Sequence, residues 1–276
     1  MQIPDFPLPS NPGIEIRFRM PTVSEAMAYS GADPEQEEAL TTRYLNEIQY
    51  KENQHDAALW TAQDRRTALW WIFCNSRIDT TLTVSYECAH CKKEHYYDYD
   101  ARALDITAGV LTIEPVETVA IPVSGQSHDW VLKPLDGRAM EHLETARNSL
   151  PAPTEPAYND ELINLRIMEL THQAHLNAQP ADFMAAAQSR YELIKRMALD
   201  TEFSPLVASI ELMNRRLAHG LAMKIEKGTA HLLLPKHRCP DSGKEGAAKY
   251  TQLYTPFRNH HFFPDFRSQW LAGINH

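Results

Sequence analysis

The sequence predicts an α+β fold with two small antiparallel hairpins, a helical N-terminal part and a largely helical second half. Three observations predict this fold. Stretches of alternating apolar residues run into turns that contain cysteine, which is the pattern of a β-hairpin. Segments with helical periodicity dominate after a proline-rich joint. Hydrophobic residues make up 43% of the 276 residues, which is enough to bury a sizeable core.

The N-terminal part is expected to contain one strand and several helices. Residues 14–18 alternate between apolar and polar side chains and predict a short strand. Ser24 is a candidate N-cap for the first helix. A second helix is expected over residues 33–50, because proline fits its first turn and the acidic side chains there interact favourably with the helix dipole. A third helix is expected over residues 56–73, with Cys74 on its apolar side in the core.

Two hairpins follow these helices. Residues 80–87 and 95–100 predict two strands, and the Cys-x-x-Cys motif of residues 88–91 forms the turn between them. Residues 116–123 and 129–135 predict a second hairpin, whose turn contains a Ser-Gly pair. Asp136 is then a candidate N-cap for a helix through about Arg147.

The second half is predicted to be mainly helical, with breaks at prolines. Gly228 is expected to end the last helix, and His172 and His175 are expected on a solvated helix face. Three prolines at positions 151, 153 and 156 form the joint that precedes these helices. The expected elements are helices over residues 159–177, 181–199 and 205–227, a strand over 230–234 and a returning strand over 250–253.

The sequence is therefore divided into three parts. Residues 1–150 form a mixed α/β part that contains the Cys-x-x-Cys hairpin and the second hairpin. Residues 151–228 form a helical region. Residues 229–276 form another cysteine-containing hairpin and an aromatic tail, which is expected to pack back on the first part because its aromatic side chains need a core.

Two half-complete metal-binding turns are the most informative motifs. The Cys-x-x-Cys spacing lets the thiolates of Cys88 and Cys91 face one point. The second turn, residues 237–243, has the same outline with serine in place of its second cysteine. Zinc takes about four ligands in a tetrahedron. Cys239 is therefore the third candidate ligand, and His237 or His95 is the fourth.

Side by side, the two turns would form a zinc-ribbon-like pair of β units. Two interpretations stay open: the thiols hold a structural zinc, or they are a metal-free relic, because the hydroxyl of Ser242 is a poor zinc ligand. Such a ribbon holds distant segments together and carries out no chemistry. We therefore expect no catalytic residue.

Composition and motifs disfavour several function classes. The net charge of −9 disfavours nucleic-acid binding, which needs a basic face. No stretch of 18 apolar residues predicts a membrane span, and the N-terminus lacks the pattern of a secretory signal. The sequence also lacks a phosphate-binding loop, a nucleophile elbow and a dinucleotide-binding turn. Two alternatives remain: a zinc- or thiol-dependent enzyme centred on Cys88 and Cys91, and a nucleic-acid-binding zinc ribbon.

The order of short motifs along the chain is distinctive. The motifs lie at residues 6–10, 14–18, 22–27, 69–78, 88–91, 119–125, 130–137, 239–240 and 262–264. This order resembles the baseplate hub and hub-assembly proteins of contractile-tailed bacteriophages. Members of that family open on a Leu-Pro-Ser segment and carry a Cys-x-x-Cys before a strand. A hairpin and an acid-capped helix follow, and the chain closes with Cys-Pro-x-Cys and a Phe-Phe tail.

The resemblance implies a non-enzymatic role, either as a component of the tail baseplate or as a chaperone that builds its hub. It implies other tail and baseplate proteins as partners, with a second copy of the chain as a further candidate, and neither nucleic acid nor membrane. The implied location is the host cytoplasm during assembly, with or without retention in the virion tail. The implied metal positions are Cys88, Cys91 and Cys239. Ser242 stands where the family has its last cysteine, and this departure bears on the metal and not on the role.

Overall fold

The computed structural model describes residues 2–31, 33–107, 109–177, 179–226, 228–241 and 249–265. In these ranges the chain forms seven α-helices and several small antiparallel sheets, which confirms the predicted α+β class. None of the described helices is both long and apolar enough to cross a membrane.

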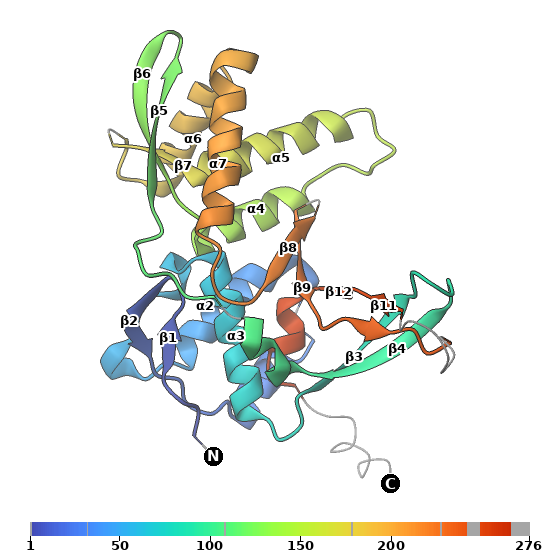
Figure 1. The fold of residues 1–276 in the computed structure, drawn as a ribbon. Coiled ribbons are helices and arrows are strands. Elements are labelled where there is room, and N and C mark those ends of the chain that lie inside the picture. Colours follow the sequence, from blue (N-terminus) through green and yellow to red (C-terminus); the bar gives the residue numbers. More distant parts are fainter. Residues whose placement is uncertain are drawn as a thin grey trace.

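Two hydrophobic cores divide the molecule into a lower and an upper body (Figure 1). The lower core combines both ends of the chain, from Ile3 to Leu104 and from Leu221 to Phe263. The upper core is built from the middle of the chain, between Leu111 and Leu217. The chain therefore leaves the lower body once and returns to it, and the C-terminal aromatic residues Phe257, Phe262 and Phe263 fill the lower core.

The lower body contains three helices and four of the sheets. The β-strands pair as β1 with β2, β3 with β4, β10 with β11, and β8 and β12 on either side of β9. Its helices are α1 (Val23–Tyr29), α2 (Glu37–Glu47) and α3 (Ala62–Ser76). Its strands are β1 (Phe6–Leu8), β2 (Asn11–Ile16), β3 (Thr81–Glu87), β4 (Glu94–Asp100), β8 (Met223–Glu226), β9 (Thr229–Leu233), β10 (His237–Arg238), β11 (Tyr250–Thr251) and β12 (Tyr254–Pro256).

Short helical turns connect several of these elements. They lie at Pro34–Gln36, Lys51–Asn53, Ala57–Leu59, Ala101–Thr107 and Asn259–Phe262, and a π-helical turn in the upper body spans Leu199–Phe203. The predicted N-cap Ser24 is wrong. Thr22 caps α1 instead, because its hydroxyl accepts the N–H of Glu25 while the Glu25 carboxylate accepts the N–H of Thr22, which forms a capping box.

The upper body packs helices α5, α6 and α7 against a three-stranded sheet of order β5–β6–β7, and helix α4 lies between the two bodies. As predicted, Asp136 caps α4 by accepting the N–H of Ala139. Helix α4 contacts both α2 and α5, so it joins the two bodies. The elements are β5 (Glu117–Val123), β6 (Gln126–Leu132), α4 (Gly137–Asn148), α5 (Tyr158–Gln173), β7 (Ala174–Leu176), α6 (Phe183–Ile194) and α7 (Ser204–Arg216).

Three expectations about the second half are wrong. Helix α7 ends at Arg216, well before the expected end at residue 227, because residues 223–226 pair with β9 as strand β8. Gly228 does not end a helix but lies in the turn between β8 and β9, with φ +76°. His172 does not lie on a solvated face, because it is 2% exposed and contacts His142 and Phe183.

The chain passes between the two bodies at two points, and the backbone segments at these two points are hydrogen-bonded to each other. Gly109 and Gly220 exchange two backbone hydrogen bonds of 2.7 Å. Beside them, the buried Thr61 hydroxyl bonds both the Asp64 carboxylate (2.8 Å) and His219 Nε2 (2.7 Å). The seam between the bodies is therefore a hydrogen-bonded junction that joins residues 61–64, Gly109 and residues 219–220.

Candidate metal centre

The tip of the β3–β4 hairpin lies beside strands β10 and β11, although they are far apart in the sequence (Figure 1). The N–H of Ala89 donates to the hydroxyl of Thr251 (3.3 Å), and His90 Nε2 donates to the carbonyl of Tyr250 (3.1 Å). An ion pair of 2.8 Å joins Lys93 to Asp241. These contacts hold the two turns in one register against each other.

The first turn has a backbone that suits two thiolate ligands. Strand β3 ends at Glu87, and the N–H of Cys88 donates to the carbonyl of Lys93 (2.9 Å). The N–H of Lys92 donates back to the carbonyl of Cys88 (3.0 Å), and Lys92 adopts a left-handed conformation with φ +59°. This tight turn places the side chains of Cys88 and Cys91 on the same side.

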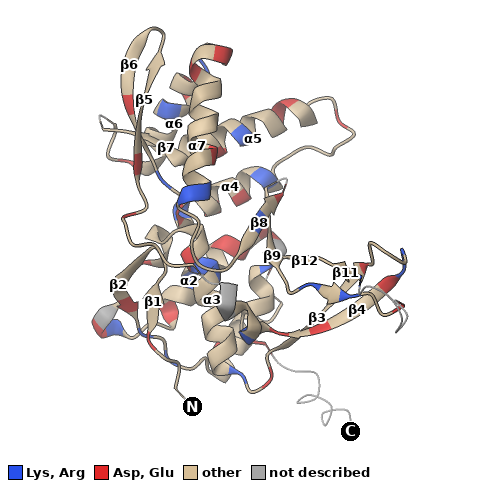
Figure 2. Ribbon diagram, viewed as in Figure 1, with Lys and Arg blue, Asp and Glu red and all other residues tan. Residues whose placement is uncertain are grey.

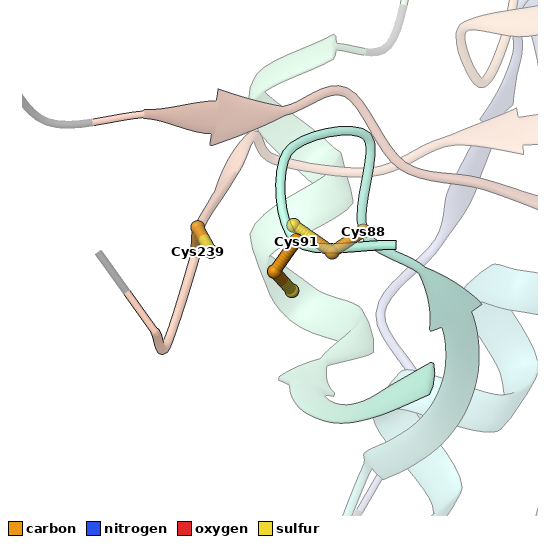
Figure 3. Close-up of side chains that lie close together, drawn as sticks. All are labelled: Cys88, Cys91 and Cys239. Atoms are coloured by element: carbon orange, nitrogen blue, oxygen red, sulfur yellow. The ribbon is translucent and has the colours of Figure 1, made fainter. Parts of the chain in front are cut away.

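Three thiols converge between the hairpins. Figure 3 shows Cys88 and Cys91 on one loop and Cys239 on the segment that faces it. Their sulfur atoms all lie within 4.8 Å of one another, and none of the four cysteines forms a disulfide. A tetrahedral zinc with Zn–S bonds of about 2.3 Å would place its sulfur ligands about 3.8 Å apart. The donor set and its spacing therefore fit a thiolate-bound metal ion such as zinc.

A histidine stands next to this group. The Nε2 atom of His95, on β4, lies 3.1 Å from the sulfur of Cys91. With Asp241, these two residues form a second group of ligand atoms that lie within 4.8 Å of one another. His95 is therefore the nitrogen ligand that could complete a Cys₃His set, and the carboxylate of Asp241 is the oxygen alternative.

The predicted ligand His237 does not join the thiols. Its Nδ1 atom bonds the hydroxyl of Tyr86 (2.6 Å), and its ring stacks on Tyr97 with ring centroids 4.3 Å apart. Among the described histidine, cysteine and acidic side chains, the group around Cys88 does not include it. Aromatic packing on the face of the β3–β4 sheet determines where the ring of His237 lies. The spacing of residues in the turn does not indicate this packing.

The structure thus brings together Cys88, Cys91 and Cys239 of the predicted ligands. Ser242, which replaces the family's last cysteine, lies outside the described residues. Asp241 was not predicted as a ligand candidate, and no signal in the sequence separates it from other surface acids. Cys74 lies in the lower core, as expected for a small apolar side chain.

Hydrogen bonds in the first turn favour a thiolate at Cys88. The N–H of Cys91 contributes most and is assisted by the N–H of His90 and the hydroxyl of Thr251, so that the pKa of Cys88 falls to about 6 although burial opposes this. The pKa of Cys91 is raised instead. The N–H of Lys93 lowers it, but burial and the thiols of Cys88 and Cys239 together raise it by more. A metal cation between the sulfurs would relieve this repulsion.

Comparison of the chain with protein-family models, with curated proteins and with solved structures found no match. Function is therefore inferred from the residues and their geometry.

Proposed function

We propose that this chain is a component of a phage tail baseplate hub, or an assembly protein for it, and that it acts by binding other tail proteins. The convergence of Cys88, Cys91 and Cys239 carries the proposal. In the motif order that resembles the hub family, the Cys-x-x-Cys at residues 88–91 and the Cys-Pro at residues 239–240 lie far apart in the sequence. Because the two motifs meet in space, the binding of one metal ion would account for both of them.

We propose zinc as the metal and a structural role for it. Cys88 is 0% exposed and Cys239 is 3% exposed, whereas a catalytic zinc needs an open position for water or substrate. Cys88, Cys91, Cys239 and His95 would hold the ion. The bound ion would fix the two hairpins as one rigid unit, because thiolate ligation links two segments that short strands alone hold weakly.

A zinc- or thiol-dependent enzyme centred on Cys88 and Cys91 is the competing proposal. It requires that a reactant reach both thiols, whereas Cys88 has no exposed surface and only Cys91 is partly exposed. We therefore prefer the binding role, and location in the host cytoplasm during assembly follows from it.

Affinity purification of the tagged chain from phage-infected host cells, followed by mass spectrometry, tests the binding role. We expect tail or baseplate proteins in a stoichiometric complex. A chain that is recovered alone or only as a homo-oligomer at every stage of infection would contradict the proposal. Mass spectrometry of purified particles then shows whether the chain remains in the virion.

Metal analysis of cysteine variants tests the metal. We expect about one zinc per chain in the wild type and loss of that zinc in Cys91→Ser and Cys239→Ser, because each variant removes one thiolate from a set of about four ligands. Cys74→Ala is the matched control, because Cys74 lies in the core and should leave the zinc content unchanged. Wild-type protein that is purified without chelator and contains no metal would contradict the assignment.

A further inference from the structure

A cleft of about 790 Å³ lies at the seam between the two bodies. Its walls come from α3, α4, α5, α7 and β8, so it forms only when the middle of the chain folds onto the ends. Apolar side chains line part of it, among them Leu143, Leu165 and Leu221. Its volume lies within the range of about 300–1,000 Å³ that is typical of ligand sites.

The lining of the cleft is basic, although the whole chain carries a net charge of −9. Figure 2 shows basic positions at the lower end of α7, at the end of α4 and on β8, all around the seam. Ion pairs neutralise part of the lining, since Glu169 pairs with Arg166 (2.7 Å) and Lys224 pairs with Glu226 (3.0 Å). The charged lining residues are Arg66, Arg147, Arg215, Lys224, Glu169 and Glu211.

Arg66 is the basic group that most requires a partner. It lies on α3 and is half-buried, and no described group forms a hydrogen bond or ion pair with its guanidinium. The carboxylate of Glu38 influences its pKa but is already paired with Arg65 (3.1 Å). Burial lowers the pKa of Arg66. A half-buried cation on the wall of the cleft, with no counterion among the described residues, favours the binding of an anionic group.

Strand β8 offers the cleft a free edge. It is the outer strand of the β12–β9–β8 sheet, and Met223, Lys224 and Ile225 all line the cleft. The N–H of Leu233 donates to the carbonyl of Ala222 (3.2 Å), so in the alternating antiparallel pattern the backbone groups of Met223 and Ile225 point away from β9. No described strand pairs with that side of β8. Such an edge can accept a strand from another chain.

We propose that this cleft binds an extended acidic segment of a partner protein. The segment adds as a strand along the free edge of β8, and its carboxylates lie against Arg66, Arg147 and Arg215. Its alternate apolar side chains pack on the partly exposed apolar lining, which includes Met140, Met223 and Leu233, since successive side chains of a strand point to opposite faces. This inference rests on the proposed binding role and assigns to it a surface and a partner chemistry.

A labelled ten-residue peptide that alternates glutamate with valine is the probe. Its binding to the full chain is followed by fluorescence anisotropy, with the lysine-for-glutamate peptide as the control. We expect the acidic peptide to bind with a Kd below about 100 µM, and we expect its affinity to fall when salt is added. The basic peptide should not bind. No binding of the acidic peptide at about 1 mM protein overturns the proposal, as does equal binding of the two peptides.

Two variants test separately how the basic side chains and the free edge of β8 contribute to peptide binding. Arg215→Gln should lower the affinity for the acidic peptide about tenfold. Arg216→Gln should leave this affinity unchanged, because Arg216 lies outside the cleft and faces Glu117. Ile225→Pro removes only an N–H that points away from β9, so it should preserve the β8–β9 pairing and abolish peptide binding. Circular dichroism and thermal melting check that each variant is folded. Unchanged binding in a folded Ile225→Pro variant overturns strand addition.

The same variants, tested in infected cells, distinguish this proposal from the proposed function. If tail proteins co-purify equally well with the wild type and with Ile225→Pro, the cleft is not the partner site and the hub role stands. If the peptide binds as expected but no tail protein co-purifies with the wild type, the cleft assignment stands and the hub role fails.

Discussion

Gly220 shows how one residue fixes the junction between the two bodies. Its φ is +69°, and a β-carbon there would overlap the hydroxyl of Thr67 and lie 3.2 Å from the carbonyl oxygen of Gln63. The same hydroxyl accepts the N–H of Leu221 (3.2 Å). Both the left-handed backbone and the close packing therefore require glycine.

Gly220→Ala should reduce the free energy of unfolding by roughly 2–4 kcal/mol, because backbone strain and steric overlap add to each other. Gly125→Ala is the matched control. Gly125 has φ +78° in the turn between β5 and β6 but has open space around it, so only the backbone strain of roughly 1 kcal/mol applies. Urea denaturation of both variants measures the difference, and equal losses would contradict the packing argument.

Packing between helices determines the protonation of His172, which was predicted to be solvated. His172 on α5 lies between His142 of α4 (2.8 Å between ring nitrogens) and the ring of Phe183 on α6. Its Nδ1 atom is buried without a hydrogen-bond partner among the described residues. Burial, assisted by the charges of neighbouring groups, lowers the pKa of His172 to about 3, and burial also lowers the pKa of His175 to about 4.

Acid should therefore destabilise the upper body. The pKa of His172 is lower in the folded chain than its ordinary value of 6.5, so its contribution to stability is complete above pH 6.5 and is lost as the pH falls below that value. At pH 5 the loss for one such histidine is about 2 kcal/mol. His172→Gln should flatten the decline in the free energy of unfolding between pH 7 and pH 5, whereas His128→Gln in the β5–β6 hairpin should not. Parallel declines in all three proteins would contradict this account.

Elements whose signal lies in neighbouring residues were predicted well from the sequence. Elements whose structure depends on contacts with residues far away in the sequence were predicted poorly. Asp136 caps its helix as predicted, because a cap needs only the next turn of the chain. Residues 217–226 retain a helical spacing of apolar side chains, but they leave the helix because Gly220 turns the chain and β9 offers a pairing partner. His172 was misplaced for the same reason, since the helices that bury it are separate elements.

At the scale of the whole molecule, the thiol cluster could be predicted from the sequence, whereas the basic cleft could not. The convergence of Cys88, Cys91 and Cys239 was expected, because each half-complete turn lacks ligands that the other can supply. The basic cleft was not expected, because its residues come from four helices, three strands and the loops between them, which carry no shared motif. Only the folding of the middle of the chain onto its ends creates that surface.

The two hairpins project from the lower body, so their linkage should matter locally rather than globally (Figure 1). Cys239→Ser should increase hydrogen exchange in residues 81–98 and 249–251 and leave both hydrophobic cores protected, because neither core contains Cys88 or Cys239. Phe262→Ala should have the opposite pattern. Phe262 is 3% exposed, stacks on Phe257 and contacts Phe73 edge-on, so its loss should cost about 3–5 kcal/mol and reduce protection throughout the lower core.

Hydrogen exchange followed by mass spectrometry of peptic fragments resolves the two patterns, because both hairpins and both cores yield separate fragments. If Cys239→Ser lowers protection in α3 as much as it does in β3 and β4, the thiol cluster supports the whole lower body and is not a local clamp. If the wild type shows the same fast exchange at β3 and β4 with and without a chelator, no metal links the hairpins. The expected result is fast exchange only after the thiol or the metal is removed, because the strands of β10 and β11 are too short to hold this contact by themselves.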